Sequence, residues 1–281
     1  MTSRDLTSAP DAEFALRGVT KKYPGFALGP LDLVVPRGFV MGLVGANGAG
    51  KTTAIKVGLG MVHPDEGRAQ DVDRTRLGVV MDSAPYPALW KVRDVHRALA
   101  PFYPRWDQAR FDELLGWAGI DEKKCIKELS RGMSMRLQLA VALSHGAELL
   151  VLDEPTSGLD PLARRELVDM LAEFMTDERH SVLFSTHITT DLDRVADYIT
   201  LLHNGRVLTS GTRDELVESF RTVRGARSHL DDVRGLVRGL RLHDAGWEGL
   251  MATEHTVALN GSAAVEEPSL DDIIVAFAKE N

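Results

Sequence analysis

A run of eight residues has the types and the spacing of a phosphate-binding loop. It covers residues 45–52, reads GANGAGKT and matches the pattern G-x-x-x-x-G-K-[ST]. Glycines let the backbone turn tightly enough for N–H groups to point at phosphate oxygens, and a following helix adds a positive dipole end. In this pattern Lys51 is expected to reach the β- and γ-phosphates of a nucleotide, and the Thr52 hydroxyl to bind Mg²⁺. The predicted phosphate-binding residues are Gly45, Ala46, Asn47, Gly48, Ala49, Gly50, Lys51, Thr52 and Thr53.

Two neighbouring carboxylates, Asp153 and Glu154, follow the apolar run LLVL at residues 149–152. If this run is a strand of an open α/β sheet, its carboxyl end lies where ligands bind. We expect Asp153 to hold Mg²⁺, directly or through water, and Glu154 to orient or deprotonate an attacking water. The alternative is an acidic strand end that only begins a turn, because Pro155 follows. The phosphate-binding loop favours the catalytic interpretation.

At residues 129–133, which read LSRGM, the chain resembles the ATP-binding cassette (ABC) ATPases. The segment is similar to the signature sequence of that family, and its Ser130 stands 23 residues before Asp153 (153 − 130). We expect Ser130 to cap an amphipathic helix, so that its hydroxyl, the Gly132 N–H and the helix dipole can face an anion. The resemblance implies that this anion is the γ-phosphate of ATP bound to the opposite subunit. Standing alone, the pentapeptide would be interpreted as an ordinary helix cap.

Other elements of the family follow in order along the chain. Tyr23 stands where an aromatic residue stacks on adenine, although a half-buried hairpin aromatic is the competing interpretation. Residues 157–160, which read SGLD, are similar to the loop that communicates across the dimer. His187, 34 residues beyond Asp153 (187 − 153), matches the switch histidine of the family. The catalytic residues that the resemblance implies are Glu154, His187 and Lys51.

The chain departs from the family pattern at its signature and at the end of the LGVVM run. Arg131 and Met133 stand where the signature usually has Gly and Gln, and Asp82 stands where Gln is common. An ionised Asp82 can bind Mg²⁺ or position water beside the nucleotide, but it cannot donate a hydrogen bond. The predicted metal ligands are therefore Thr52, Asp153 and Asp82.

Two further features narrow the resemblance. Asp82 stands only 31 positions after Lys51 (82 − 51), which predicts a shortened β-subdomain. The segment FYPRWD at residues 102–107, together with Asp82 and LSRGM, resembles bacterial exporter ATPases of the bacitracin-resistance type, often encoded beside a GntR-type regulator. Such ATPases associate with separate membrane-spanning subunits.

Strands and helices must bring these residues together, and the hydrophobic pattern predicts both. Buried strands are expected at residues 39–44, 77–81, 149–152 and 182–184. Helices are expected at residues 51–59, 163–174 and through the helical pattern of residues 92–146. Hairpins are expected at residues 13–35, with turns at Pro24-Gly25 and Gly29-Pro30, and at residues 198–208, with a turn at Asn204-Gly205.

The alternation of strands and helices predicts an α/β fold with a mostly parallel sheet. The resemblance specifies a P-loop NTPase, an ABC-type nucleotide-binding domain with an antiparallel β-subdomain, a helical subdomain and a small C-terminal appendage. The expected domains are residues 1–219, with the helical subdomain at about 86–146, and residues 220–281, which end in an amphipathic helix capped by Ser269. The alternative for residues 220–281 is a tail that packs back on the core.

Composition excludes several function classes. The chain has 281 residues, 33 Lys and Arg against 41 Asp and Glu, and a net charge of −8, so nucleic acid is not an expected partner. The single cysteine excludes an intrachain disulfide. The first fourteen residues lack the apolar run of a signal peptide, and no stretch approaches the ~18 apolar residues of a spanning helix.

These observations predict the ATP-hydrolysing subunit of a bacterial ABC exporter. It would bind MgATP at a composite interface with a second ABC ATPase subunit, an identical or a related one, and couple hydrolysis to membrane-spanning permease subunits. Its expected location is cytoplasmic, peripheral to the inner face of the cell membrane. The competing classes are a soluble ABC protein acting on DNA or ribosomes, which usually has two cassettes or a coiled-coil insertion, and a nucleotide-binding regulator without turnover. The exported substrate cannot be inferred, because the membrane subunits select it.

Overall fold

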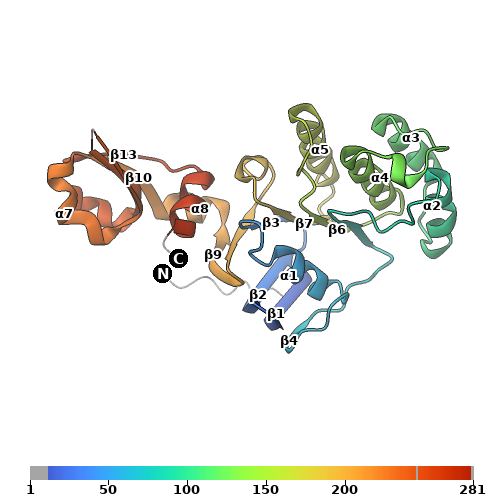
Figure 1. Cartoon of the computed structure of the whole chain (residues 1–281), viewed down its shortest axis with the longest axis horizontal. Coiled ribbons are helices and arrows are strands. Elements are labelled where there is room, and N and C mark those ends of the chain that lie inside the picture. The colour runs from blue at the N-terminus through green and yellow to red at the C-terminus, as the bar shows by residue number, and fades with distance from the viewer. Residues whose placement is uncertain (1–11, 245, 280–281) are drawn as a thin grey trace.

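A six-stranded, mostly parallel sheet carries the segments expected to do chemistry (Figure 1). The computed structural model describes residues 12–244 and 246–279. In spatial order the strands are β5 (Leu77–Val80), β6 (Leu149–Asp153), β7 (Ser181–Thr186), β3 (Val40–Val44), β8 (Tyr198–His203) and β9 (Arg206–Thr212). Neighbours run parallel except β8 and β9, which form the predicted hairpin. The carboxyl ends of the parallel strands therefore meet at one edge, where open α/β sheets bind ligands.

Different layers cover the two faces of this sheet (Figure 1). On one face α1 (Lys51–Gly58) lies against a three-stranded antiparallel sheet, the shortened β-subdomain. Its strands, in spatial order, are β2 (Phe26–Pro36), β1 (Ala12–Tyr23) and β4 (Glu66–Ala69). Gly58 packs so closely on Phe14 that a Cβ at this glycine would lie 1.9 Å from the ring Cζ atom. The other face is covered by α4 (Arg131–Ser144) and α5 (Pro161–Phe174).

The hairpin of β1 and β2 confirms one predicted turn and shows that the other was wrong. Pro24-Gly25 is the turn, whereas Gly29-Pro30 lies inside β2. Pairing of β1 with β2 is irregular beside Gly29, whose φ is +94° and whose Cβ, if present, would lie 2.0 Å from the Val19 carbonyl oxygen. The Gly29 N–H donates to the Gly205 carbonyl at 2.6 Å, so this glycine serves a close crossing of two hairpins. A sequence pattern cannot distinguish such a crossing from a turn.

The helical pattern of residues 92–146 forms three helices with a core of their own. They are α2 (Val92–Leu99), α3 (Gln108–Ala118) and α4. Asp107 begins α3, because its carboxylate accepts from the Arg110 N–H at 2.9 Å, and Gly119, with φ of +64°, ends it. Phe111 and Leu137 are fully buried where these helices meet. By contrast, Leu89, Trp90 and Phe102 leave this core and are 74%, 37% and 74% exposed.

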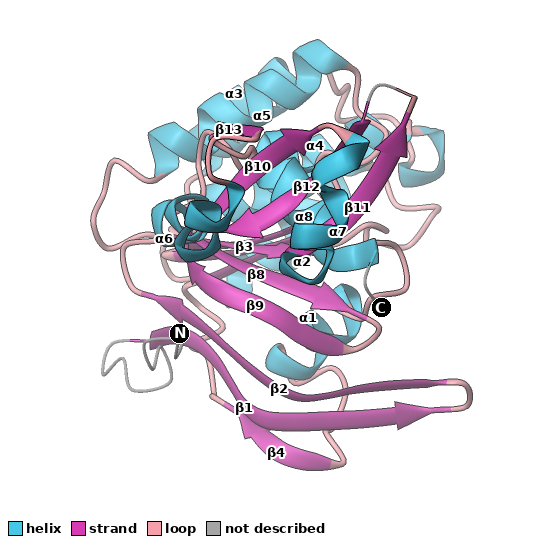
Figure 2. Cartoon of the chain, turned by 90° about the vertical axis from the view of Figure 1, so that its left-hand side faces the viewer, coloured by secondary structure: helices cyan, strands magenta, loops and turns pink. Residues whose placement is uncertain are grey.

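Residues after α6 (Arg213–Ser219) form a second antiparallel sheet (Figure 2). Its strands, in spatial order, are β11 (Val237–His243), β12 (Gly246–Ala252), β10 (Phe220–Gly225) and β13 (Ala263–Glu266). Trp247 and Met251 lie in a separate hydrophobic cluster, to which α7 (Leu230–Val233) also contributes. These residues therefore form a hydrophobic cluster of their own, while Leu250 of β12 packs in the core of the central sheet.

The last helix, α8 (Leu270–Lys279), returns to the central core. The predicted cap is confirmed, since the Ser269 hydroxyl accepts from the Asp272 N–H at 3.1 Å. Leu270 and Ile273 pack with Leu192 of the central core, and the Thr189 hydroxyl donates to Asp271 at 3.0 Å. The C-terminal residues thus combine a core of their own with a helix packed back on the main core.

Short 3-10 helices complete the described chain. They are η2 (Ala100–Phe102), η3 (Ile126–Glu128), η4 (Thr189–Asp191), η5 (Arg227–His229), η6 (Arg234–Leu236) and η7 (Thr253–Leu259). Over residues 12–244 and 246–279, no helix combines the length and the apolar character needed to cross a membrane.

Candidate nucleotide-binding site

The loop between β3 and α1 has a backbone conformation that requires glycine at several positions. Gly48 and Gly50 adopt φ of +83° and +110°, which side chains other than glycine rarely tolerate. A Cβ at Gly45 would lie 2.2 Å from the Leu202 carbonyl oxygen, and one at Gly50 would lie 2.9 Å from the Phe26 ring. The Gly205 N–H, in the turn between β8 and β9, donates to the Ala49 carbonyl at 2.9 Å. The loop is therefore pressed against two hairpins on the side away from its opening.

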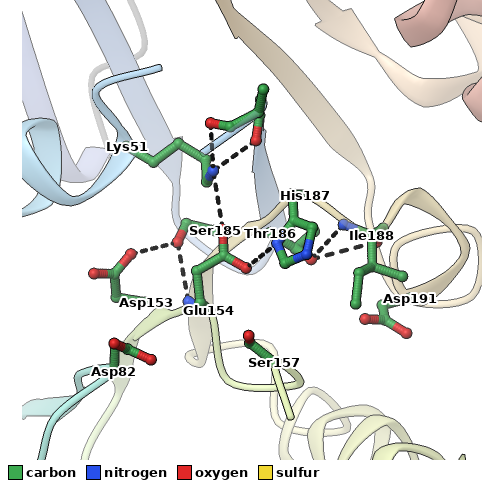
Figure 3. A network of polar contacts seen from close by, with 12 residues as sticks. Lys51, Asp82, Asp153, Glu154, Ser157, Ser185, Thr186, His187, Ile188 and Asp191 are labelled. Atoms are coloured by element: carbon green, nitrogen blue, oxygen red, sulfur yellow. Dashed lines mark hydrogen bonds and ion pairs between the residues drawn. The ribbon is translucent and has the colours of Figure 1, made fainter. Parts of the chain in front are cut away.

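Lys51 lies beneath this loop, at the start of α1, and is only 5% exposed. Its ammonium donates to the carbonyls of Gly45 and Ala46 at 2.6 and 3.1 Å. The same nitrogen lies 2.9 Å from Glu154 Oε1 (Figure 3). A buried cation is thus held at the helix N-terminus by loop carbonyls and by the carboxylate that the sequence pattern singled out. Thr53 follows in the first turn of α1 and is half-buried.

Asp153 and Thr52 meet at the end of β6. The Thr52 hydroxyl donates to Asp153 Oδ2 at 2.7 Å, and the Ser185 hydroxyl donates to Oδ1 at 2.7 Å. Asp153 is fully buried. A hydroxyl and a carboxylate side by side offer the hard oxygen donors that Mg²⁺ prefers, and proteins usually bind this ion through one or two carboxylates plus substrate phosphates. No group of three or more His, Cys, Asp or Glu side chains that could hold a metal ion is found among the described residues.

Glu154 contacts both Lys51 and His187 (Figure 3). Its Oε2 lies 2.6 Å from His187 Nδ1, while Oε1 faces Lys51. The Glu154 N–H donates to both the carbonyl and the hydroxyl of Ser185 at 3.1 Å. These bonds hold Glu154 at φ of +53°, a conformation that costs energy for a residue with a side chain. Backbone strain of this kind concentrates at functional sites, and here it aims the carboxylate at the loop.

Three predicted site residues lie apart from this network. Ser130 caps α4, since its hydroxyl accepts from the Met133 N–H at 3.2 Å, and it is exposed. Gly132 follows on the same helix, and α4 covers the sheet face opposite α1. Tyr23 is 42% exposed at the end of β1, with the Lys21 ammonium 5.9 Å from its ring. Across the described residues, no hydrogen bond or ion pair links Ser130, Gly132 or Tyr23 to the phosphate-binding loop.

Asp82 has a partner that the sequence did not predict. It follows β5, and its carboxylate forms an ion pair with the guanidinium of Arg131. The same guanidinium donates to the Ser157 hydroxyl at 3.2 Å. Figure 3 draws no contact between Asp82 and Asp153. The expected magnesium ligands are therefore divided: Thr52 and Asp153 touch, and Asp82 turns to the start of α4.

Two residues of the site were missed at the sequence level. The Ser185 hydroxyl donates to Asp153, and the sequence signal that could have identified it is its place in the strand that pairs with the one ending at Asp153. Asp191 lies four residues beyond His187, is 4% exposed, and stands 3.7 Å from Arg164. Burial raises the pKa of the Asp191 carboxyl above its ordinary value, and the charge of Arg164 opposes that shift. No local pattern identifies a buried carboxylate at the end of a short 3-10 helix such as η4.

Comparison with known proteins identifies the family. The ABC transporter family model matches residues 28–157, which include the phosphate-binding loop, the start of α4 and the two carboxylates. The Nod factor export ATP-binding protein I of Burkholderia lata is 34% identical over 227 residues, which cover 75% of this chain and 74% of that protein. The chain belongs to the ABC transporter ATP-binding proteins.

The ABC protein has further relatives of the expected kind. The bacitracin transport ATP-binding protein of Bacillus licheniformis is 30% identical over 198 residues, 66% of this chain and 65% of that protein. A solved ATP-binding subunit of an ABC transporter has a TM-score of 0.64 and 26% identity, and the match covers 72% of this chain and 91% of that one. The predicted family, its resemblance to the bacitracin type and the ABC-type fold are confirmed.

Membership in this family also establishes the general activity. The ABC protein is an ATPase that uses ATP with Mg²⁺, and it is the ATP-binding subunit of a transporter with membrane permease partners. The site described above fits both molecules: the glycine path and the buried Lys51 suit phosphates, and the Thr52–Asp153 pair suits the metal.

Proposed function

We propose that two copies of the ABC protein close head to tail around two ATP molecules and thereby drive export. One observation carries this proposal. Lys51, Asp153 and Glu154 converge at the strand ends, whereas the exposed Ser130 and the half-buried Gly132 stand at the head of a helix on the opposite face. A helix N-terminus with a free face suits an anion. A second copy would bring that anion to Ser130 and Gly132, because a two-fold axis repeats both halves of the site.

Within each site, ATP and water would be converted to ADP and phosphate. Thr52 and Asp153 would hold Mg²⁺, which when bound would supply positive charge to offset that of the phosphates. Lys51 would leave Glu154 for the more highly charged phosphates, which would release Oε1 of Glu154. Glu154 would then accept a proton from the attacking water, and His187 would hold the carboxylate through Oε2. Tyr23 would contact the adenine ring through the exposed part of its own ring, since the residue is 42% exposed.

Export through separate membrane subunits rests on two kinds of support. The printed names of relatives include Nod factor export and bacitracin transport. Leu89 and Trp90, just before α2, and Phe102, in η2, also expose their side chains to solvent. Exposed apolar side chains of this size suit a protein partner. We assign this surface to the permease subunits, which would hold the ABC protein at the cytoplasmic face of the membrane.

The proposal also divides the chain into domains. Residues 1–219 would form the nucleotide-binding domain, with a helical subdomain at about 86–146, since Phe111 and its neighbours have a core of their own. Residues 220–281 would form the appendage, supported by the separate cluster around Trp247. Through α8 the appendage contacts the central core, and Asp271 of this helix accepts a hydrogen bond from Thr189, which lies two residues after His187.

A mixing experiment tests the composite site. Lys51→Ala removes one half of the site, and Ser130→Arg blocks the other half, so neither variant should hydrolyse ATP alone. A mixed dimer would contain one intact site, with Lys51 from one chain and Ser130 from the other. We expect an equimolar mixture to recover up to about a quarter of the wild-type rate, since about half of the dimers are mixed and each has one intact site of two. A mixture as inactive as its parts would contradict a site shared between copies.

A further inference from the structure

Two of the residues at which this chain departs from the family pattern, Arg131 and Asp82, are in contact with each other. Arg131 opens α4, and Asp82 follows β5. Their side chains form an ion pair, and the same guanidinium nitrogen donates to Ser157, in the loop after Glu154. We call Asp82, Arg131 and Ser157 the signature clamp. It joins the signature helix to the loops that follow two neighbouring strands, β5 and β6.

Fold stability does not explain this arrangement. A cation in the first turn of a helix opposes the helix dipole, so Arg131 is unfavourable for α4 itself. Arg131 and Asp82 are both about half exposed, with side-chain exposures of 51% and 53%, and exposed ion pairs contribute little to stability. The arginine stem nevertheless lies beside the loop that follows β6, since a Cβ at Gly158 would lie 3.3 Å from Arg131 Cδ. The side chain is therefore held on both sides by loops of the nucleotide site.

We propose that the signature clamp positions Ser130 and Gly132 for the partner's nucleotide, and that Asp82 acts through Arg131 rather than on Mg²⁺. The planar guanidinium can bind a carboxylate and a hydroxyl at once, which a single point charge does less well. The head of α4 is thereby fixed relative to the strand ends that carry Asp153 and Glu154. This inference rests on the proposed function, because the signature acts only across a dimer. Asp82, Arg131 and Ser157 are then positioning residues, and the magnesium ligands of the chain are Thr52 and Asp153.

Dimer formation gives the first test. In the Glu154→Gln background, which slows hydrolysis, the ATP-dependent dimer dissociation constant is measured by sedimentation. Arg131→Ala and Asp82→Ala should each raise it about tenfold, and the double variant should be no worse than either one, because each removes the same contact. The matched control is Arg136→Ala, which removes another arginine of α4, paired with Glu166 at 3.1 Å and lying outside the clamp. This control should dimerise like its parent.

Two further measurements, exchange of the two charges and the Mg²⁺ dependence of nucleotide binding, distinguish the clamp from a residue that only stabilises the fold. The exchanged pair Asp82→Arg with Arg131→Asp should recover most of the dimer affinity that either reversal loses. The Mg²⁺ concentration that half-saturates binding of a fluorescent ATP analogue should rise for Thr52→Ala and stay unchanged for Asp82→Ala. A rise for Asp82→Ala would make Asp82 a metal ligand and overturn the proposal.

The remaining outcomes separate the clamp from the function on which it rests. If the Glu154→Gln parent dimerises with ATP and the clamp variants do so equally well, the clamp is wrong and the composite site stands. If the parent shows no ATP-dependent dimer at any concentration, the composite site fails and the clamp fails with it.

Discussion

Glu154→Gln should reduce steady-state ATP hydrolysis by about 10²- to 10⁴-fold, the usual contribution of a positioned general base. The amide keeps the shape of the side chain but cannot accept a proton from water. ATP affinity should be equal to or higher than that of the wild type. The reason is the 2.9 Å contact between Lys51 and Glu154 Oε1, which competes with phosphates for the ammonium and is weakened when the charge is removed. The measurements are phosphate release at saturating MgATP and nucleotide binding by calorimetry.

A matched control for this variant is Glu178→Gln, which changes an exposed glutamate in the turn before β7. It should hydrolyse ATP at the wild-type rate. Turnover by Glu154→Gln within a few fold of the wild type would remove Glu154 from the role of water-activating residue. Another carboxylate near the site, such as the buried Asp191, would then have to be examined.

Lys51→Gln should weaken ATP binding by about 10- to 100-fold, since a hydrogen bond to a charged group contributes about 1.5–3 kcal/mol. The glutamine can still donate to the carbonyls of Gly45 and Ala46, so the loop keeps part of its support. What it loses is the buried positive charge beneath the phosphates. Calorimetric titration with ATP, together with a thermal unfolding curve of each variant, measures both effects.

Lys51→Ala separates charge from loop support, because it removes the donor as well as the charge. Both variants leave Glu154, 13% exposed at its side chain, without its cation, but only alanine also leaves the Gly45 and Ala46 carbonyls without a donor. We therefore expect a lower melting temperature for Lys51→Ala than for Lys51→Gln. Lys56→Ala, a lysine of the same helix outside the loop, is the control and should bind ATP normally. Wild-type affinity in folded Lys51→Gln would contradict the role of this lysine.

The centre of the site could be predicted from local sequence because its parts are local patterns. A strand, a glycine loop and a helix start follow one another within residues 40–58, and Asp153 ends an apolar strand. The meeting of Thr52 with Asp153 then follows from parallel strands that end at one edge. The roles of Tyr23 and of the dimer came instead from resemblance to a family.

Contacts between distant segments could not be predicted in this way. The pairing of Asp82 with Arg131 depends on how α4 lies across the strand ends, which no spacing in the sequence determines. The prediction of a turn at Gly29-Pro30 was wrong for a similar reason. A glycine is required there because the backbone of Gly29 contacts that of Gly205, far along the chain. Trp90 illustrates the limit of hydrophobic patterning: its side chain suits a core as well as a docking surface, and only the structure shows it exposed.

The dependence of ATP hydrolysis on protein concentration tests the shared site most directly. Rates of the unmodified ABC protein are measured at saturating MgATP over several decades of concentration, with Glu154→Gln as the blank. If two copies build each site, the rate per chain should rise with concentration and level off once the dimer is complete. A constant rate per chain down to the lowest concentration would mean that one copy suffices, and would contradict the composite site.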